Sequence, residues 1–231
     1  ITAYEAAGIT GITADNLLAV NAQIRKQLAA DSDATVNLDT VAEIQGKVAA
    51  ANTALAYLVS DVAPEAYALD DVSGGEAVLT TSEQLSAYAE AGILNVTADN
   101  LLAMNAQMRL ETTATNKDSV ADIQAIVGLA DDAIALIEEY NNGDGATALT
   151  NTATTLTPAD YAAAGIRGVT ADNQVAVNQA ILAANTGEAD QVSEIQSLVN
   201  TGIQAQLDAL ALISDYADPL VVGTRVAVGD A

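Results

Sequence analysis

The side chains of this chain that could do chemistry are almost all carboxylates and amides. Its 231 residues include 31 Asp and Glu and 7 Lys and Arg, but no His, Cys, Trp or Phe. Without these types the chain lacks the parts of Ser-His-Asp and Cys-His triads, of imidazole and thiolate metal sites, of disulfides and of most base-stacking platforms. The composition therefore predicts a protein that is not an enzyme and has no catalytic residues.

Paired carboxylates are the remaining catalytic candidates. Adjacent acids occur at 131–132 and 138–139, and such pairs do acid–base work in some enzymes. No second catalytic group accompanies them in the sequence. We therefore interpret both pairs as parts of solvated helix faces.

Calcium is the metal that an acidic chain would favour. An EF-hand loop requires oxygen ligands at fixed positions around a Gly and a closing Glu, and the segments around Gly74 and Gly145 do not supply them. We expect no cofactor and no dedicated metal site. Nonspecific calcium binding would involve linker carboxylates, namely Asp70, Asp71, Glu76 and Asp144.

The formal net charge of −24 limits the partners of the chain. A phosphate-coated surface repels such a chain, and seven cationic side chains are too few to offset the repulsion. No apolar run approaches the ~20 residues of a membrane-spanning helix. We expect no nucleic-acid partner and no membrane insertion; neighbouring modules or copies of the same protein are the expected partners.

A sequence block occurs three times along the chain. The copies begin at Tyr4, Tyr88 and Tyr161 and read YEAAGITGITADNLLAVN, YAEAGILNVTADNLLAMN and YAAAGIRGVTADNQVAVN. A second block follows each copy as DTVAEIQ, DSVADIQ and DQVSEIQ. Blocks that recur in the same order indicate three homologous modules.

Each module reads as three helices. The first is short and ends at a Gly that favours a left-handed C-cap, namely Gly8, Gly92 or Gly165. We expect the second helix to present the apolar residues Ala14, Leu18, Ile24 and Leu28, and the third Val41, Ile44, Val48, Leu55 and Leu58. The expected N-caps are Thr13, Thr97 and Thr170 for the second helices and Asp39, Asp118 and Asp190 for the third.

The predicted fold class is all-α, with three small three-helix modules in tandem. Gly-containing segments separate the modules and are typical of turn-rich linkers, and the C-terminal tail is β-prone. The expected bounds are 1–62, 81–140 and 157–218 for the modules, 63–80 and 141–156 for the linkers, and 219–231 for the extended tail.

Recurrent side-chain amides are the most informative polar residues. Asn21, Asn105 and Asn178 fall on apolar helix stripes, and we expect their amides to be buried and bonded to the preceding loop. A ligand-contacting role is the alternative. The same two interpretations apply to Asn16, Asn100 and Asn173, and to Gln45, Gln124 and Gln196, for which we favour a bond to a loop or neighbouring module.

The pattern Y-x-x-A-G-I-x-x-[VI]-T-A-D-N-x-x-A-x-N, followed by D-x-V-x-[DE]-I-Q, resembles the Ala-rich helical repeats of very large bacterial cell-surface proteins. These are the biofilm-associated and type-I-secreted adhesins. The resemblance covers the three modules, from Tyr4 to Tyr216, but neither the linkers nor the tail. It implies an extracellular, structural segment that acts as an extender or assembles into a filament or biofilm matrix. A helical module that binds a host or matrix protein, and so serves cell adhesion, is the alternative.

Overall fold

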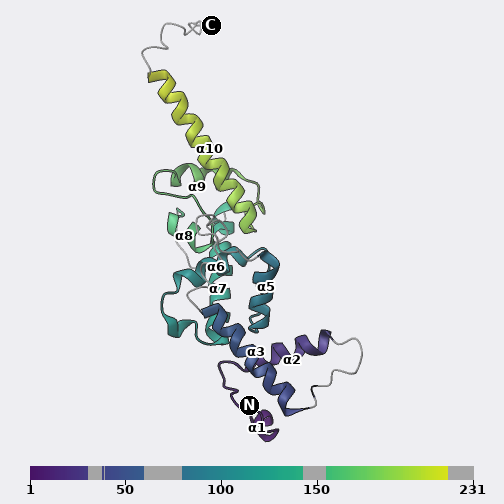
Figure 1. The fold of residues 1–231 in the computed structure, drawn as a ribbon. Helices are drawn as coiled ribbons and strands as arrows, with labels where there is room; N and C mark the ends of the chain where they lie inside the picture. The colour runs from purple at the N-terminus through teal and green to yellow at the C-terminus, as the bar shows by residue number, and fades with distance from the viewer. Residues whose placement is uncertain (31–37, 39, 60–79, 143–154, 218–231) are drawn as a thin grey trace. The chain divides into compact units, whose positions relative to one another are not determined.

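The computed structural model of the chain describes residues 1–30, 38, 40–59, 80–142 and 155–217. Within these ranges every regular element is a helix, which confirms the all-α class for this part of the chain (Figure 1). The expected tail lies outside these ranges, as do most of both expected linkers and the linker carboxylates Asp70, Asp71, Glu76 and Asp144.

The helices form two compact units. Unit 1 comprises Ile1–Ile134 with the short segment Ala163–Gly165, and unit 2 comprises Ala135–Ala162 with Ile166–Ala231. This grouping does not follow the three sequence modules, whose bounds stay a prediction.

Unit 1 is built from short helices whose small and branched residues face one another. Its helices are α1 (Thr2–Ala6), α2 (Leu17–Ala30), α3 (Val41–Val59), α5 (Thr81–Glu90), α6 (Leu101–Leu110), the 3₁₀ turn η1 (Ala114–Asn116) and the first part of α7 (Val120–Asn141). Helix α2 packs against α3, and both contact α5. The apolar stripe of α3 is buried at Val48, Ala51, Leu55 and Leu58.

The buried face of α2 differs from the expected one. Leu18 and Leu28 are exposed, whereas Ala19, Val20 and Gln23 are buried. The reason is steric: Ala19 is small enough for a neighbouring turn to lie directly against the helix backbone. The larger Leu18 stands at the edge of that contact.

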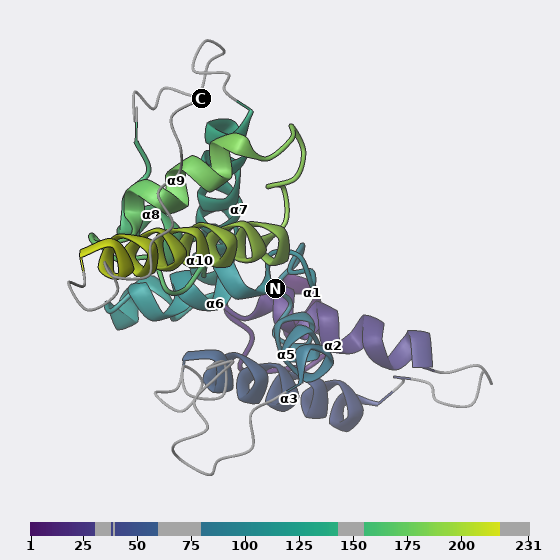
Figure 2. The same ribbon diagram turned by 90° about the horizontal axis from the view of Figure 1, so that it is seen from above.

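Unit 2 contains α8 (Pro158–Ala163) up to Ala162, α9 (Gln174–Ala183), α10 (Val192–Ala217) and the last turns of α7. Helices α9 and α10 lie side by side, as both views show (Figures 1 and 2). Their approach is close because α10 carries Gly202 at the crossing, where a Cβ would lie 2.8 Å from the Cα of Val177. Helix α10 then continues well past α9 (Figure 1).

Capping boxes start the first helices of the second and third modules. The Thr80 hydroxyl accepts the Glu83 N–H, and the Glu83 carboxylate accepts the Thr80 N–H at 2.7 Å. Thr157 and Asp160 form the same reciprocal pair at the start of α8, with Pro158 at the first helical position.

The second helices begin one turn later than expected. Helices α6 and α9 have Asn100 and Asn173 at the N-cap position. A turn precedes α6, closed by a hydrogen bond from the Thr97 N–H to the Asn100 side chain at 2.8 Å. Residues 98–100 form that turn, and α6 begins after it. The expected caps were Thr13, Thr97 and Thr170.

The caps of the third helices stand one residue later than expected. The Ser119 hydroxyl accepts the Asp122 N–H at 3.1 Å, and the Thr40 hydroxyl accepts the Glu43 N–H at 3.2 Å. A hydroxyl at this position reaches the N–H three residues on, while the acid at that residue binds the hydroxyl in return. The expected caps were Asp118 and Asp190, together with Asp39, which lies outside the described ranges.

The start of α10 lacks such a hydroxyl because Gln191 precedes the helix. Here the carboxyl groups of Asp190 and Glu194 share a hydrogen bond instead, and this bond raises the pKa of Glu194.

Candidate functional site: a recurrent helix–turn–helix motif

Each module contains the same turn between its first and second helices, and the candidate site is built on it. The turn begins at a Gly in the left-handed region, with φ of +80° at Gly8, +80° at Gly92 and +75° at Gly165. The next N–H then donates back to the carbonyl of the module's Tyr, as Ile93 does to Tyr88 at 3.0 Å. Only Gly adopts this φ without strain, which explains the residue type.

A second left-handed position lies three residues further along the turn. Gly11 and Gly168 occupy it in the first and third modules, with φ of +77° and +84°. The second module has Asn95 with φ of +64°, the only non-Gly residue with positive φ among the described residues. Asn is one of the few L-residues that tolerates this conformation.

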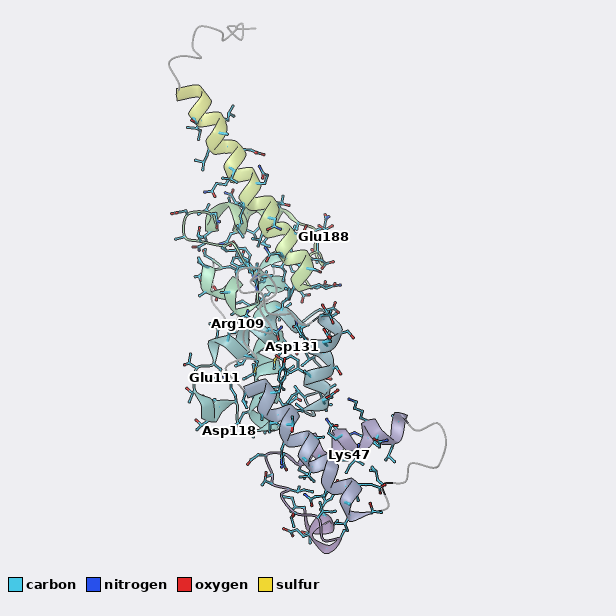
Figure 3. All side chains as sticks on the ribbon, in the orientation of Figure 1. Lys47, Arg109, Glu111, Asp118, Asp131 and Glu188 are labelled. Atoms are coloured by element: carbon cyan, nitrogen blue, oxygen red, sulfur yellow. The ribbon has the colours of Figure 1, made fainter. Side chains whose placement is uncertain are left out.

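One recurrent Asn closes the turn from inside. The Asn100 side chain accepts the Thr97 N–H and donates to the Asn95 carbonyl at 2.9 Å. Its amide also donates to Asp131 of α7, labelled in Figure 3, at 2.8 Å. Asn16 and Asn173 make the same two turn bonds, and Asn16 adds one to Asn52 of α3. These amides replace the backbone partners that an irregular turn lacks.

A recurrent Gln clamps the turn from the third helix. The Gln124 amide accepts the Leu94 N–H at 2.8 Å and donates to the Leu94 carbonyl at 3.0 Å. Gln45 forms the same pair of bonds with Thr10, and Gln196 with Arg167. Both polar backbone groups of one residue are thus satisfied by a single side chain.

The other recurrent Asn bonds a different partner from the one expected. The Oδ1 atoms of Asn21, Asn105 and Asn178 accept hydrogen bonds from the hydroxyls of Tyr4, Tyr88 and Tyr161 at 2.6, 2.8 and 2.7 Å. The expectation of a bond to the loop before the same helix is therefore corrected. The physical reason is that the buried phenol also needs a partner.

The burial of these pairs differs along the chain. Asn105 and Asn178 are buried, as are Tyr88 and Tyr161, whereas Tyr4 and Asn21 are half-buried. The free amide protons also have partners: Asn105 donates to Gln84 at 2.7 Å and Asn178 to the Leu156 carbonyl at 2.9 Å. Burial of its hydroxyl raises the pKa of Tyr161 well above the usual range, which keeps the phenol protonated and a donor.

The Gly of the turn also makes a contact between sequence modules. In unit 1, Gly92 lies against α2, where a Cβ would be 2.8 Å from the Leu18 and Ala19 backbone. Gly165, which belongs to the same unit, lies against α6, where a Cβ would be 2.5 Å from the Leu102 oxygen. We call this arrangement the helix–turn joint. It consists of the turn Gly and the second-helix backbone of the preceding module.

A side-chain hydrogen bond accompanies both helix–turn joints. Gln23 of α2 donates to the Glu90 carbonyl at 2.7 Å, and Gln107 of α6 donates to the Ala163 carbonyl at 2.9 Å. Each acceptor lies two residues before its Gly. The sequence signal for Gln23 and Gln107, absent from the predicted site residues, is their identical place two residues after the second Asn of their modules.

An open groove of about 600 Å³ lies beside the first joint, between α2, α3 and α5 of unit 1. Its walls include Ala54 and Tyr57, and its carboxylates are Glu83 and Glu90. Hydrogen bonds from Thr80 lower the pKa of Glu83, and the bond from Lys26 lowers that of Glu90. Both groups are therefore ionised at neutral pH and act as acceptors rather than proton donors.

Two further observations concern metals and membranes. Within the described ranges, no cluster of three or more Asp or Glu residues is arranged to hold a metal ion. Across the same residues, no helix is both long enough and apolar enough to cross a bilayer.

The charged side chains labelled in Figure 3, among them Lys47, Glu111 and Glu188, are spread over several elements of the chain.

Comparisons of the chain with protein-family models, with curated proteins and with solved structures give no match.

Proposed function

We propose that this chain is a non-enzymatic structural segment of a bacterial extracellular surface protein, which acts as an extender or scaffold. The helix–turn joint is the single observation that carries the proposal. It occurs twice among the described residues, with the same Gly, the same small Ala and the same Gln donor each time. Repeats that join through one recurrent contact are the building principle of extended repeat proteins.

The polar residues of the repeat support the same function. Asn100, Gln124 and their counterparts in the other modules form hydrogen bonds to the turn of their own module, as in the Gln124 pair with Leu94. The buried side chains of Tyr88 and Asn105 are hydrogen-bonded to each other between α5 and α6. Residues committed to internal bonds stiffen a repeat and leave little for a ligand, which is what a spacer requires.

Surface display tests this function. The chain is inserted between a membrane-anchored domain and a binding head of known affinity, and the distance of the head from the cell surface is measured by fluorescence quenching. A scaffold should increase that distance without changing the affinity of the head. An unchanged distance, or a chain that itself binds the target, would contradict the proposal.

A second candidate function is a helical binding module for a host or matrix protein. The uncovered end of α10 favours it, because Leu207, Leu210, Leu212 and Ile213 are each more than half exposed. Apolar residues gathered on one helix are typical of helix-mediated recognition. Binding of the purified chain to immobilised matrix proteins, lost in the double variant Leu210→Gln and Ile213→Gln, would support this candidate over the scaffold.

A further inference from the structure

Among the described residues, one turn and one second helix take part in no helix–turn joint. Each occupied joint buries a small residue on both sides: Ala19 and Ala91 in the first, Ala103 and Ala164 in the second are all fully buried. Burial of both Ala residues is thus the mark of an occupied joint. The turn at Gly8 and helix α9 are the turn and the second helix that remain.

The unused turn is the one in the first module. Ala7 and Gly8, which correspond to Ala91 and Gly92, are exposed. Apart from its chain neighbours, no described residue has an atom within 4 Å of a Cβ built on Gly8. The backbone of the turn is nevertheless the same, since Gly8 and Gly92 both have φ of +80°. The turn at Ala7 and Gly8 therefore has the backbone conformation of a helix–turn joint, but no described helix packs against it.

The unused helix surface is on α9 in unit 2. Val175 and Ala176 correspond to Leu18 and Ala19 of α2, and to Leu102 and Ala103 of α6. Val175 is 70% exposed, and Ala176 is half-buried where its two counterparts are fully buried. The surface that receives a turn in the first two modules is thus open in the third.

The same comparison extends to the third helices. The stripe of α10 is buried at Ile195, Val199 and Gly202, and its helical spacing continues to Leu210 and Ile213, which are exposed. In α3 the C-terminal end of the stripe, at Leu55 and Leu58, is buried, and α3 contacts α5 of the following module. Counted from the recurrent Gln, the same places of α10 are Gln206 and Ala209, and Leu210 and Ile213 follow them. The apolar end of α10 is thus exposed, whereas the stripe of α3 is buried into its last turn.

We propose that copies of this chain associate head to tail. The turn at Ala7 and Gly8 of one copy lies on Val175 and Ala176 of another, with α1 beside the uncovered end of α10. The occupant is a second copy because the chain already makes this joint twice with itself, using the same residue types on both sides. The two surfaces differ from each other, so the contact is heterologous and can propagate into a filament.

This inference deepens the proposed scaffold function and rests on it. We expect the joint between copies to be weaker than the joints inside the chain. Ala180 stands where Gln23 and Gln107 donate their hydrogen bonds, so the third surface lacks the donor. Joints inside one chain also benefit from an effective concentration of the order of 1 mM.

Analytical ultracentrifugation of the purified chain at 0.5 M NaCl tests the proposal, because this salt screens repulsion between two chains of charge −24. We expect association that grows with concentration up to about 1 mM and passes beyond the dimer. Ala7→Gln blocks the turn, and its backbone is compatible because Ala7 has φ of −85°. Ala176→Gln blocks the helix surface. Each variant alone should be monomeric.

A mixture of these two variants gives the sharpest outcome. Ala7→Gln retains a free helix surface and Ala176→Gln retains a free turn, so the mixture should form dimers and nothing larger. The matched controls are Glu5→Gln and Ala171→Gln, which should associate like the original chain. Both change exposed residues whose counterparts, such as Ala89 and Ala98, stay exposed beside occupied joints. Circular dichroism checks that all variants keep their helices.

A gain of association provides the second arm. Ala180→Gln restores the missing donor and should strengthen association about fivefold, the value expected for one additional hydrogen bond. Three results would overturn the inference: a chain that stays monomeric at 1 mM, association that survives Ala7→Gln, or an α10 surface that binds only a purified matrix protein. A monomeric chain that still extends a displayed head would refute the association and leave the scaffold function intact.

Discussion

Gly92 lies directly against the backbone of Ala19, so close that a Cβ on Gly92 would stand 2.8 Å from the Ala19 nitrogen and Cα. Gly8 has the same φ of +80°, but no atom of the other described residues, its chain neighbours aside, lies within 4 Å of a Cβ built on it. The two glycines therefore separate the effect of a left-handed backbone from the effect of a packing contact.

Replacing Gly92 with Ala should lower the free energy of unfolding more than replacing Gly8 with Ala. Both variants place a Cβ on a left-handed residue, which costs about 1–2 kcal/mol. Gly92→Ala also forces the turn away from α2, which adds about 1–3 kcal/mol of overpacking. Urea unfolding of the two variants measures the difference, and equal losses would show that the joint contributes no stability.

Replacing Asn105 with Ala should cost about 1–3 kcal/mol, because the hydroxyl of Tyr88 and the amide oxygen of Gln84 lose a buried partner. Asn21→Ala is the matched variant. It removes the same bond, to Tyr4, at a half-buried place where water can substitute. Thermal unfolding should rank Asn105→Ala as the more destabilising change, and the reverse order would contradict the assigned burial.

Replacing Gln124 with Ala should destabilise the turn of the second module. Its amide holds both the N–H and the carbonyl of Leu94, and Ala holds neither. Because Leu94 is exposed, water replaces part of the loss, and we expect about 1 kcal/mol. Hydrogen exchange of the Leu94 amide provides the measurement: it should accelerate in this variant, whereas Gln204→Ala on α10 should leave it unchanged.

The sequence allowed part of this site to be predicted, and the limit has a physical cause. A Gly after a short helix indicates a left-handed cap, and this holds equally at Gly8, Gly92 and Gly165. A packing Gly has the same local signature, so the pattern could not separate Gly92 from Gly8. The packing contact of Gly92 depends on α2 lying opposite it, and residues near Gly92 in the sequence do not indicate which helix lies there.

The polar residues illustrate the same limit. The sequence predicted a loop partner for both Asn105 and Gln124: Gln124 does bond the loop at Leu94, whereas Asn105 bonds Tyr88 and Gln84 instead. The Tyr88 hydroxyl that meets Asn105 comes from another helix, 17 residues earlier in the chain. The start of α6 illustrates a third case: Thr97 resembles a cap in the sequence, but residues 98–100 form a turn and the helix begins at Leu101.

The capping box of α5 should make stability depend on acid pH. Hydrogen bonds from the Thr80 backbone and hydroxyl lower the pKa of Glu83 below its ordinary 4.5. A carboxyl group with a lowered pKa stabilises the fold above its unfolded pKa, and this contribution is lost as the pH falls through the folded pKa. The destabilisation caused by Glu83→Ala should therefore be larger at pH 7 than at pH 3.

Melting curves of the original chain, Glu83→Ala and Glu83→Gln at both pH values measure this dependence. Glu83→Gln is the matched control, because its amide oxygen accepts the Thr80 bonds at either pH. A loss on Glu83→Ala that is the same at pH 3 and pH 7 would refute the role of the carboxylate charge.

Added NaCl should raise the melting temperature of the chain. The net charge of −24 leaves many carboxylates unpaired, and the compact state experiences more repulsion than the unfolded one. The Debye length falls from ~30 Å at 0.01 M to ~3 Å at 1 M salt, so the repulsion is screened. A melting temperature equal at 10 mM and 500 mM NaCl would contradict this account. A large rise with 1 mM calcium at constant ionic strength would instead reveal a specific metal site.

The pairing of a Tyr hydroxyl with an Asn in every module gives the chain a set of internal optical reporters. The protein has seven Tyr and no Trp, so its near-ultraviolet absorption comes from phenols alone. The ring of Tyr88 is buried and donates to Asn105, whereas Tyr4 is half-buried and donates to Asn21. Single Tyr→Phe variants at these positions would assign the change in near-ultraviolet absorption on unfolding to one module at a time. The order in which the modules melt could then be followed in the unlabelled protein.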